Sequence, residues 1–200
     1  MPGTEREIDL PAVARAAADP ANLPEGTAPG LDSSAYNMLD VFTFPNGCRI
    51  AEVEIDPETG VVTHERYTAV DDYGRLINPL LTEGQVQGGV AQGIGQALLE
   101  HTVYDSGSGQ LLSGSLMDYA LPRADDLPPF DITLAELPTS ANPLGVKGSG
   151  QAGCIAAPQT IINAIVDALD QLGIDHIDMP ATPERVWRAI RTASRASRSD

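Results

Sequence analysis

Apolar and polar residues alternate with a period of two in the first half of the chain. The alternation is clearest at Ala51, Val53 and Ile55, each followed by an acidic residue, and it predicts a strand with one buried and one solvated face. Asn46-Gly47 before this run is a strong hairpin signal, and residues 56–60 read as a second turn. The pattern therefore predicts an antiparallel β meander of about three strands.

Elsewhere the hydrophobic period is helical. Apolar residues three and four positions apart predict a short helix near the start of the chain and longer helices over residues 81–101, 154–172 and 184–193. Val86, Val90, Ile94 and Ala97 share one side of the first of these longer helices, and Gly173 is the expected stop of the second. One further strand is expected over residues 132–137. The expected fold class is α+β (α/β), in which helices pack against the β meander.

Five glycines occupy the expected helix 81–101, at positions 84, 88, 89, 93 and 95. Each costs about 1 kcal/mol of helix propensity relative to alanine, so their number requires a reason. One explanation is close packing against another helix or sheet. The other is close approach of the backbone to a ligand, with the amides of Gln85, Gln92 and Gln96 as hydrogen-bond donors.

Turn-forming residues divide the chain into three parts. A connector rich in proline and glycine follows the first helix, for which Asp9 is a candidate cap. We expect an N-terminal helix and connector over residues 1–35, one domain over residues 36–190 and a tail over residues 191–200. With 42% apolar residues, the chain has enough material for a core.

Composition and charge exclude several classes of protein. The net charge of −16 repels nucleic acid and anionic membrane, and 4% aromatic residues leave little stacking surface for single strands. No run reaches the ~18 apolar residues of a membrane span, and the N-terminus has no signal pattern. Cys48 and Cys154 are expected to be reduced thiols of a cytoplasmic protein; one disulfide between them stays open, and metal-ligand spacing is absent.

The segment 145–153 holds four glycines and a lysine directly before the expected helix 154–172. Glycines let backbone approach a ligand and a helix start offers free N–H donors, so the segment predicts an anion-binding cradle around Gln151. It matches G-x-G-x-x-G, but prolines precede it where a dinucleotide fold needs an adjacent strand, which disfavours that interpretation. A Walker A loop is excluded because glycine, not serine or threonine, follows Lys147.

Other titratable residues show no catalytic pattern. The three histidines, His64, His101 and His176, have no partner at a suggestive spacing. Asp71-Asp72 reads as solvated charge rather than as an acid–base pair. The two cysteines lack a nearby basic residue, so buried packing is their default role.

Four groups of motifs, in order along residues 36–190, carry a resemblance to a known family. They are Thr-Phe-Pro-Asn-Gly-Cys ending at Cys48 with Asp-Pro-Glu-Thr-Gly ending at Gly60; Asp-Tyr-Gly-Arg-Leu-Ile-Asn-Pro ending at Pro79 with the glutamine- and glycine-rich run to Leu98; Met-Asp-Tyr-Ala-Leu-Pro ending at Pro122; and Asn-Pro-Leu-Gly-Val-Lys-Gly-Ser-Gly-Gln-Ala-Gly ending at Gly153 with Thr-Pro-Glu-Arg-Val ending at Val186. The chain resembles the C-terminal part of the large, molybdopterin-binding subunit of the molybdenum hydroxylases. That family includes xanthine dehydrogenase, aldehyde oxidase and aerobic carbon monoxide dehydrogenase.

The resemblance implies a molybdenum–molybdopterin dinucleotide cofactor and hydroxylation of a carbon centre with water as the oxygen source. It implies partners as well: an N-terminal part of the large subunit that shares the cofactor, an iron–sulfur small subunit and an FAD medium subunit. The implied substrates are aldehydes, N-heterocycles or carbon monoxide. The isolated chain is expected to be inactive. The cofactor-binding positions that match the family are Gln85, Gly88, Gly89, Lys147, Gly148, Ser149 and Gly150, and no side chain is implied as a direct metal ligand.

The chain departs from the family at the position of the catalytic base. There the family has a glutamate, and this chain has Gln151. An amide can donate and accept hydrogen bonds but cannot take a proton, and losing a general base typically costs ~10²–10⁴ in rate. Two hypotheses follow: a hydroxylase part with altered chemistry, or a non-catalytic cofactor-binding or assembly module.

Overall fold

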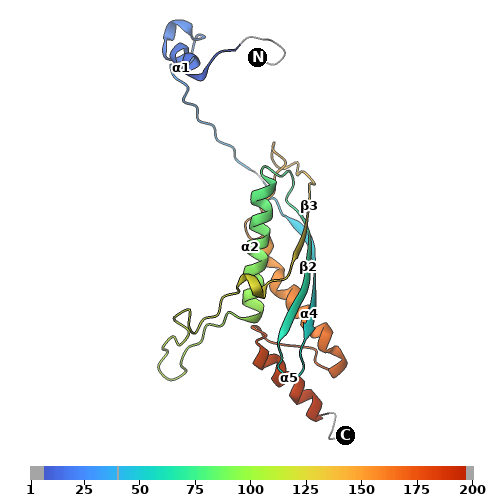
Figure 1. Cartoon of the computed structure of the whole chain (residues 1–200). Coiled ribbons are helices and arrows are strands. Elements are labelled where there is room, and N and C mark those ends of the chain that lie inside the picture. Colours follow the sequence, from blue (N-terminus) through green and yellow to red (C-terminus); the bar gives the residue numbers. More distant parts are fainter. Residues whose placement is uncertain (1–6, 40, 197–200) are drawn as a thin grey trace. The chain divides into compact units, whose positions relative to one another are not determined.

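A computed structural model describes residues 7–39 and 41–196 (Figure 1). The chain forms two compact units, residues 1–39 and residues 40–200. In the first unit, α1 (Leu10–Ala18) begins at Asp9, whose carboxylate accepts a hydrogen bond from the Ala12 amide at 2.6 Å. This cap confirms the expected first helix. A 3₁₀ turn, η1 (Pro20–Asn22), follows it in the expected connector.

The second unit contains a mixed three-stranded sheet in the order β1-β2-β3. Strand β1 (Asn46–Ile55) runs antiparallel to β2 (Val62–Asp72), whereas β3 (Phe130–Ala135) runs parallel to β2. The α+β class is confirmed, and so is the further strand expected over residues 132–137, which is β3. The antiparallel meander is confirmed for the pair β1 and β2, but the described residues contain no third antiparallel strand. Strand β3 follows β2 after about 60 residues, because a parallel neighbour needs a long crossover connection.

The hairpin signal at Asn46-Gly47 is also misplaced. These two residues begin β1 and pair with Asp72 and Asp71, and the hairpin turn lies instead at the second signal, residues 56–61. A side chain at Gly47 would collide with the Asp71 carboxylate. Glycine is therefore used here for close approach between strands rather than for a turn.

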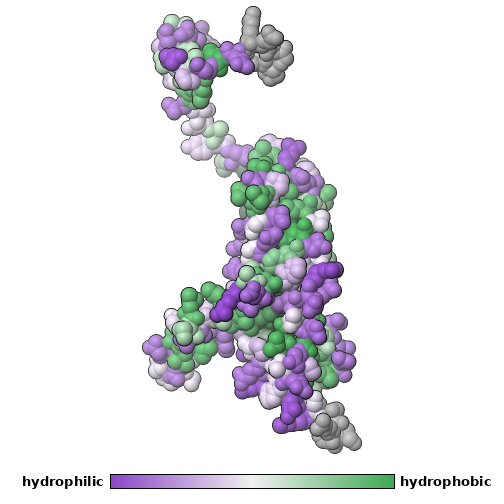
Figure 2. Space-filling view, viewed as in Figure 1, coloured by the Kyte–Doolittle hydropathy of each residue, from purple (hydrophilic) through white to green (hydrophobic). Residues whose placement is uncertain are grey.

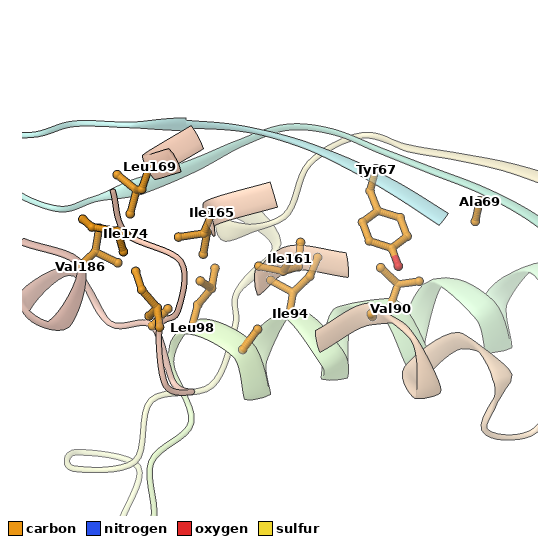
Figure 3. Close-up of a cluster of buried hydrophobic side chains, with 14 of the residues drawn as sticks. Tyr67, Ala69, Val90, Ile94, Leu98, Ile161, Ile165, Leu169, Ile174 and Val186 are labelled. Carbon is orange, nitrogen blue, oxygen red and sulfur yellow. The ribbon is translucent and has the colours of Figure 1, made fainter. Parts of the chain in front are cut away.

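The helices supply the other side of the core. Helix α2 (Pro79–Leu98) begins at the Asn78 cap and buries the predicted stripe Val86, Val90, Ile94 and Ala97 completely. Next come α3 (Ala152–Ile155), α4 (Ala157–Leu169) and η3 (Asp170–Leu172). In Figure 3, Tyr67 and Ala69 of β2 lie opposite Val90, Ile94 and Ile161, so strand and helices share one core.

The last helix among the described residues is α5 (Pro183–Ala196). Gly173 ends the helical segment before it, and its φ of 71° is left-handed as expected for a helix end. Helix α5 is longer than the predicted 184–193 and takes up part of the expected tail, of which residues 197–200 lie outside the described residues. The remaining short element, η2 (Ala124–Asp126), precedes β3.

The segment from Ala152 to Leu172 has the length and mean hydropathy of a membrane span. Its apolar residues Ile161, Ile165 and Leu169 are buried in the core of the second unit. Core helices pass the same test of length and composition, so this segment is accounted for by packing against α2 and β1.

Candidate functional site

Residues 145–153, here called the glycine loop, lie beside the end of β2. Val146 forms an isolated bridge with Gly74, the Lys147 amide donates to the Tyr73 carbonyl at 2.8 Å, and the Arg75 amide donates to the Gly145 carbonyl at 2.9 Å. The loop therefore leaves the sheet at a fixed point and runs into α3.

The side chain of Lys147 pairs with Asp72, and both are mostly buried, with side-chain exposures of 12% and 7%. The Asp72 carboxylate also accepts hydrogen bonds from the amides of Gly74 at 2.8 Å and Leu137 at 3.1 Å. Burial raises the pKa of Asp72, but the Lys147 bond and these amides outweigh it and hold the pKa below its usual value. The positive charge of Lys147 is thus compensated within the domain.

Asp71 lies on the opposite side of the strand and is paired with Arg49. The guanidinium of Arg49 donates to the Asp71 carboxylate and, through its other terminal nitrogen, to the Gly153 carbonyl, both at 2.8 Å. The Tyr73 hydroxyl donates to the same carboxylate at 2.8 Å, and burial together with this carboxylate raises the pKa of Tyr73. The interpretation of Asp71-Asp72 as solvated charge is wrong, since their exposures are 2% and 6%.

Two cavities flank the glycine loop, and the Gln85 side chain lies between them by donating to the Gly150 carbonyl at 2.6 Å. The larger, of about 470 Å³, is lined by Arg75, Asn78, Gln85, Lys147, Ser149 and Gly150 among others. The smaller, of about 300 Å³, is lined by Gly84, Gln85, Gly88, Gly89, Gln92 and Gln151 together with Gly150, Cys154 and Ile155.

Nearly all of the predicted site residues come together at these two cavities. Gly148 is the exception, since it lines neither, and Arg75 is a cavity-lining residue that sequence reasoning missed. The available signal was its place in the motif Asp-Tyr-Gly-Arg-Leu-Ile-Asn-Pro that ends at Pro79; its position beside the glycine loop is seen only in the structure. The Gln151 side chain is exposed and makes no cap hydrogen bond to α3.

The glycines at the site divide into two kinds. A Cβ on Gly89 would lie 2.8 Å from Gly153 Cα, and one on Gly153 would lie 2.6 Å from the Val86 carbonyl oxygen, so both glycines are required by the crossing of α2 and α3. At Gly84, Gly88, Gly148 and Gly150 an added Cβ would meet nothing within 4 Å. The packing explanation for the glycine-rich helix is therefore confirmed at Gly89, whereas Gly84 and Gly88 have no packing reason and the ligand explanation stays a prediction for them.

Neither His64 nor His176 joins this site. His64 lies beside a separate cavity of about 370 Å³ at the C-terminal end of α2, and burial lowers its pKa. His176 is exposed, with its ring nitrogen 3.0 Å from Asp178. Cys48 and Cys154 are free thiols, and the described residues contain no group of three or more His, Cys, Asp or Glu side chains that could hold a metal ion.

Within the part of the chain that the structure describes, the α+β domain presents backbone amides, glutamine amides and one cation that forms no ion pair, Arg75, around two cavities. Such a donor set suits an anionic organic ligand with hydrogen-bonding edges. Residues 5–128 match the family of molybdopterin cofactor-binding domains.

Relatives of known identity agree with this match. The nicotine 6-hydroxylase large subunit of Paenarthrobacter nicotinovorans is 42% identical over 173 residues, which cover 86% of this chain and 21% of that protein. The carbon monoxide dehydrogenase large chain of Hydrogenophaga pseudoflava is 36% identical over 168 residues, covering 84% of this chain and 21% of that protein. Among solved structures, quinoline 2-oxidoreductase from Pseudomonas putida 86 is similar with a TM-score of 0.80 and 40% identity, over 86% of this chain and 22% of that one.

The chain belongs to the molybdopterin cofactor-binding domain family and corresponds to part of a molybdenum hydroxylase large subunit. It spans about a fifth of the length of these relatives.

Proposed function

We propose that this chain forms one wall of the molybdenum–molybdopterin site of a hydroxylase large subunit. The observation that carries the proposal is the bare backbone at the two cavities. Gly84, Gly88 and Gly150 line them, and a Cβ on any of the three would meet nothing within 4 Å. The Gln85–Gly150 hydrogen bond joins the two segments that carry these glycines. Glycines that packing does not require are expected where a ligand approaches the backbone closely.

The residues present fit such a cofactor. A pterin carries amide-like hydrogen-bonding edges, which glutamine side chains can match as donors and acceptors, and its phosphates require N–H donors or a cation. Gln85, Gln92 and Gln151 line the smaller cavity, and Arg75 lines the larger one. We assign the cofactor-binding role to Gln85, Gly88, Gly89, Lys147, Gly148, Ser149 and Gly150, with Arg75 as the added cation.

When bound, the cofactor would supply the redox chemistry that hydroxylates a carbon centre. The residues of this chain would hold and orient it. Gln85 fixes the glycine loop through the Gly150 carbonyl, and Gln151 presents an exposed amide at the position of the family's base. Because an amide does not accept a proton, Gln151 can orient an oxygen or a substrate but cannot deprotonate it.

The dinucleotide form of the cofactor, transfer of electrons to iron–sulfur and flavin subunits and a cytoplasmic location are further parts of the proposal. The second unit exposes apolar side chains (Figure 2), including Phe42 at 89%, Leu80 at 78% and Met117 at 92% exposed, and this supports a surface for a partner. Apolar side chains at this exposure are typical of surfaces that another protein part covers. We propose the remainder of the large subunit as that cover.

The test is Gln151→Glu in the complex assembled with the N-terminal part of the subunit and the two smaller subunits. Restoring a carboxylate should raise turnover per bound molybdenum by ~10²-fold, the lower end of what a general base contributes. Gln92→Glu is the matched control, because it adds the same charge to the same cavity away from the base position.

Turnover that stays unchanged at equal molybdenum content would contradict a missing-base role for Gln151. Absence of molybdenum from the assembled complex would contradict the cofactor-site proposal itself, and would favour an assembly module.

A further inference from the structure

Consecutive aspartates at the end of β2 hold opposite ends of the glycine loop. We propose that Asp71 and Asp72 are positioning residues, which stretch the loop between two buried ion pairs and thereby set the place of Gln151. The placement of Gln151 at a reaction centre rests on the proposed function; the anchoring itself does not.

The strand geometry allows two neighbouring aspartates to contact opposite ends of the glycine loop. Neighbouring residues of a strand point to opposite faces, so Asp71 and Asp72 reach different partners from adjacent backbone positions. Asp71 faces the helices with Arg49 and Tyr73, whereas Asp72 faces the start of the glycine loop and Lys147.

The first anchor works through Arg49. The Arg49 side chain is only 5% exposed, and its guanidinium joins the Asp71 carboxylate to the Gly153 carbonyl, two residues beyond Gln151. Gly153 is also pressed against α2 at Gly89. The C-terminal end of the loop is therefore fixed by a charged contact from β1 and a packing contact from α2.

The second anchor works through Lys147, whose side chain pairs with Asp72 while its amide donates to the Tyr73 carbonyl. Residues 148–151 lie between the anchors. Both of their glycines face open space, and the Gln85 side chain donates one hydrogen bond to the Gly150 carbonyl. Removing either charge should loosen its own end of the loop first.

The experiment uses the 200-residue chain with Cys48→Ser as background, so that Cys154, in the first turn after Gln151, is the reporting thiol. Amide hydrogen exchange of peptides covering residues 147–155 and the rate of Cys154 alkylation by iodoacetamide are measured. Asp71→Asn and Arg49→Lys should speed exchange near residue 153 and alkylation at least tenfold, and Asp72→Asn should speed exchange near residue 147.

Arg49→Lys is the conservative variant: an ammonium can keep the pair with Asp71 but cannot also reach the Gly153 carbonyl with the fixed fork of a guanidinium. It keeps the experiment informative if Asp71→Asn fails to fold. Glu52→Gln is the control, because it removes the exposed Glu52–Arg66 pair on the same two strands, at 3.8 Å, and should change neither rate.

Unchanged exchange over residues 147–155 in all three variants would overturn the anchoring, as would acceleration spread equally over β2 and α4. These two measurements need no cofactor, so their outcome does not depend on the proposed function. In the assembled, molybdenum-loaded complex, Asp71→Asn should reduce the gain from Gln151→Glu at least tenfold; an undiminished gain would show that the anchor does not position this residue.

Discussion

Two sets of glycines lie within a few residues of each other and have opposite surroundings. Gly89 and Gly153 are pressed together where α2 crosses α3, and Gly93 lies against Ala157 and Pro158. Gly88 and Gly150 border the smaller cavity and face open space. Glycines thus allow close helix packing on one side of α2 and leave its backbone uncovered on the other.

The difference identifies which glycines have a structural explanation. A packing glycine offsets its cost in helix propensity by the close contact it permits between elements. A bare glycine in α2, such as Gly88, has no such compensation within this chain. Its presence therefore points to something outside the chain that approaches the helix, which is the physical basis for placing a cofactor there.

The strongest test of the comparison is Gly89→Ala. The added methyl group would lie 2.8 Å from backbone atoms of Gly153 and Cys154, which cannot rotate away as a side chain would. Overpacking of this kind costs ~1–3 kcal/mol, and the gain in helix propensity does not offset it because α3 must move. We expect a loss of ~2–3 kcal/mol in the free energy of unfolding, measured by urea denaturation with an unchanged m-value. An unaltered stability would show that the crossing is loose and that the two sets of glycines do not differ.

Local periodicity was enough to predict much of the fold. The Val86–Val90–Ile94 stripe, the alternation at Ala51 and Val53 and the stop at Gly173 depend on neighbours a few residues away, and the structure confirms them. The parallel pairing of β3 was out of reach, because it depends on contacts between residues about 60 positions apart.

The same limit applies to the candidate site. Gln85 and Gly150 were both selected as ligand-binding residues, but the hydrogen bond between them spans 65 positions of sequence. Asp72 was taken as solvated because its partner Lys147 lies 75 positions away, and no local signal reveals such a pair. Residue type and glycine content predict a site; its internal ion pairs require the fold.

The cavity beside His64, at the opposite end of α2, offers a further contrast, because the helix and its C-cap line it with the large side chains of Ile94, Leu98 and Leu99 and not with bare glycines. Burial lowers the folded-state pKa of His64 below 6.5, so the unfolded chain binds a proton more readily. Stability should therefore fall as pH drops through about 6.5 toward the folded pKa. His64→Phe should remove this component, which is ~1.4 kcal/mol for each pKa unit of difference.

The measurement is the free energy of unfolding of both proteins at pH 7.5 and pH 5.5. If His64→Phe keeps the full pH dependence of the free energy of unfolding, other groups produce that dependence and His64 is solvated in solution.

The smallest expected effect, and the one with opposite sign, is Gly88→Ala. The new methyl group meets nothing within 4 Å, so the substitution should stabilise the isolated chain by ~0.5–1 kcal/mol through helix propensity alone. In the assembled complex the same methyl group would project into the smaller cavity and should lower molybdenum content, whereas Gln96→Ala, on an exposed position further along α2, should not. A variant that is more stable yet binds less cofactor separates the two purposes of glycine within one helix. A variant that is less stable without cofactor would instead make Gly88 a packing residue, and would remove the bare backbone on which the site proposal depends.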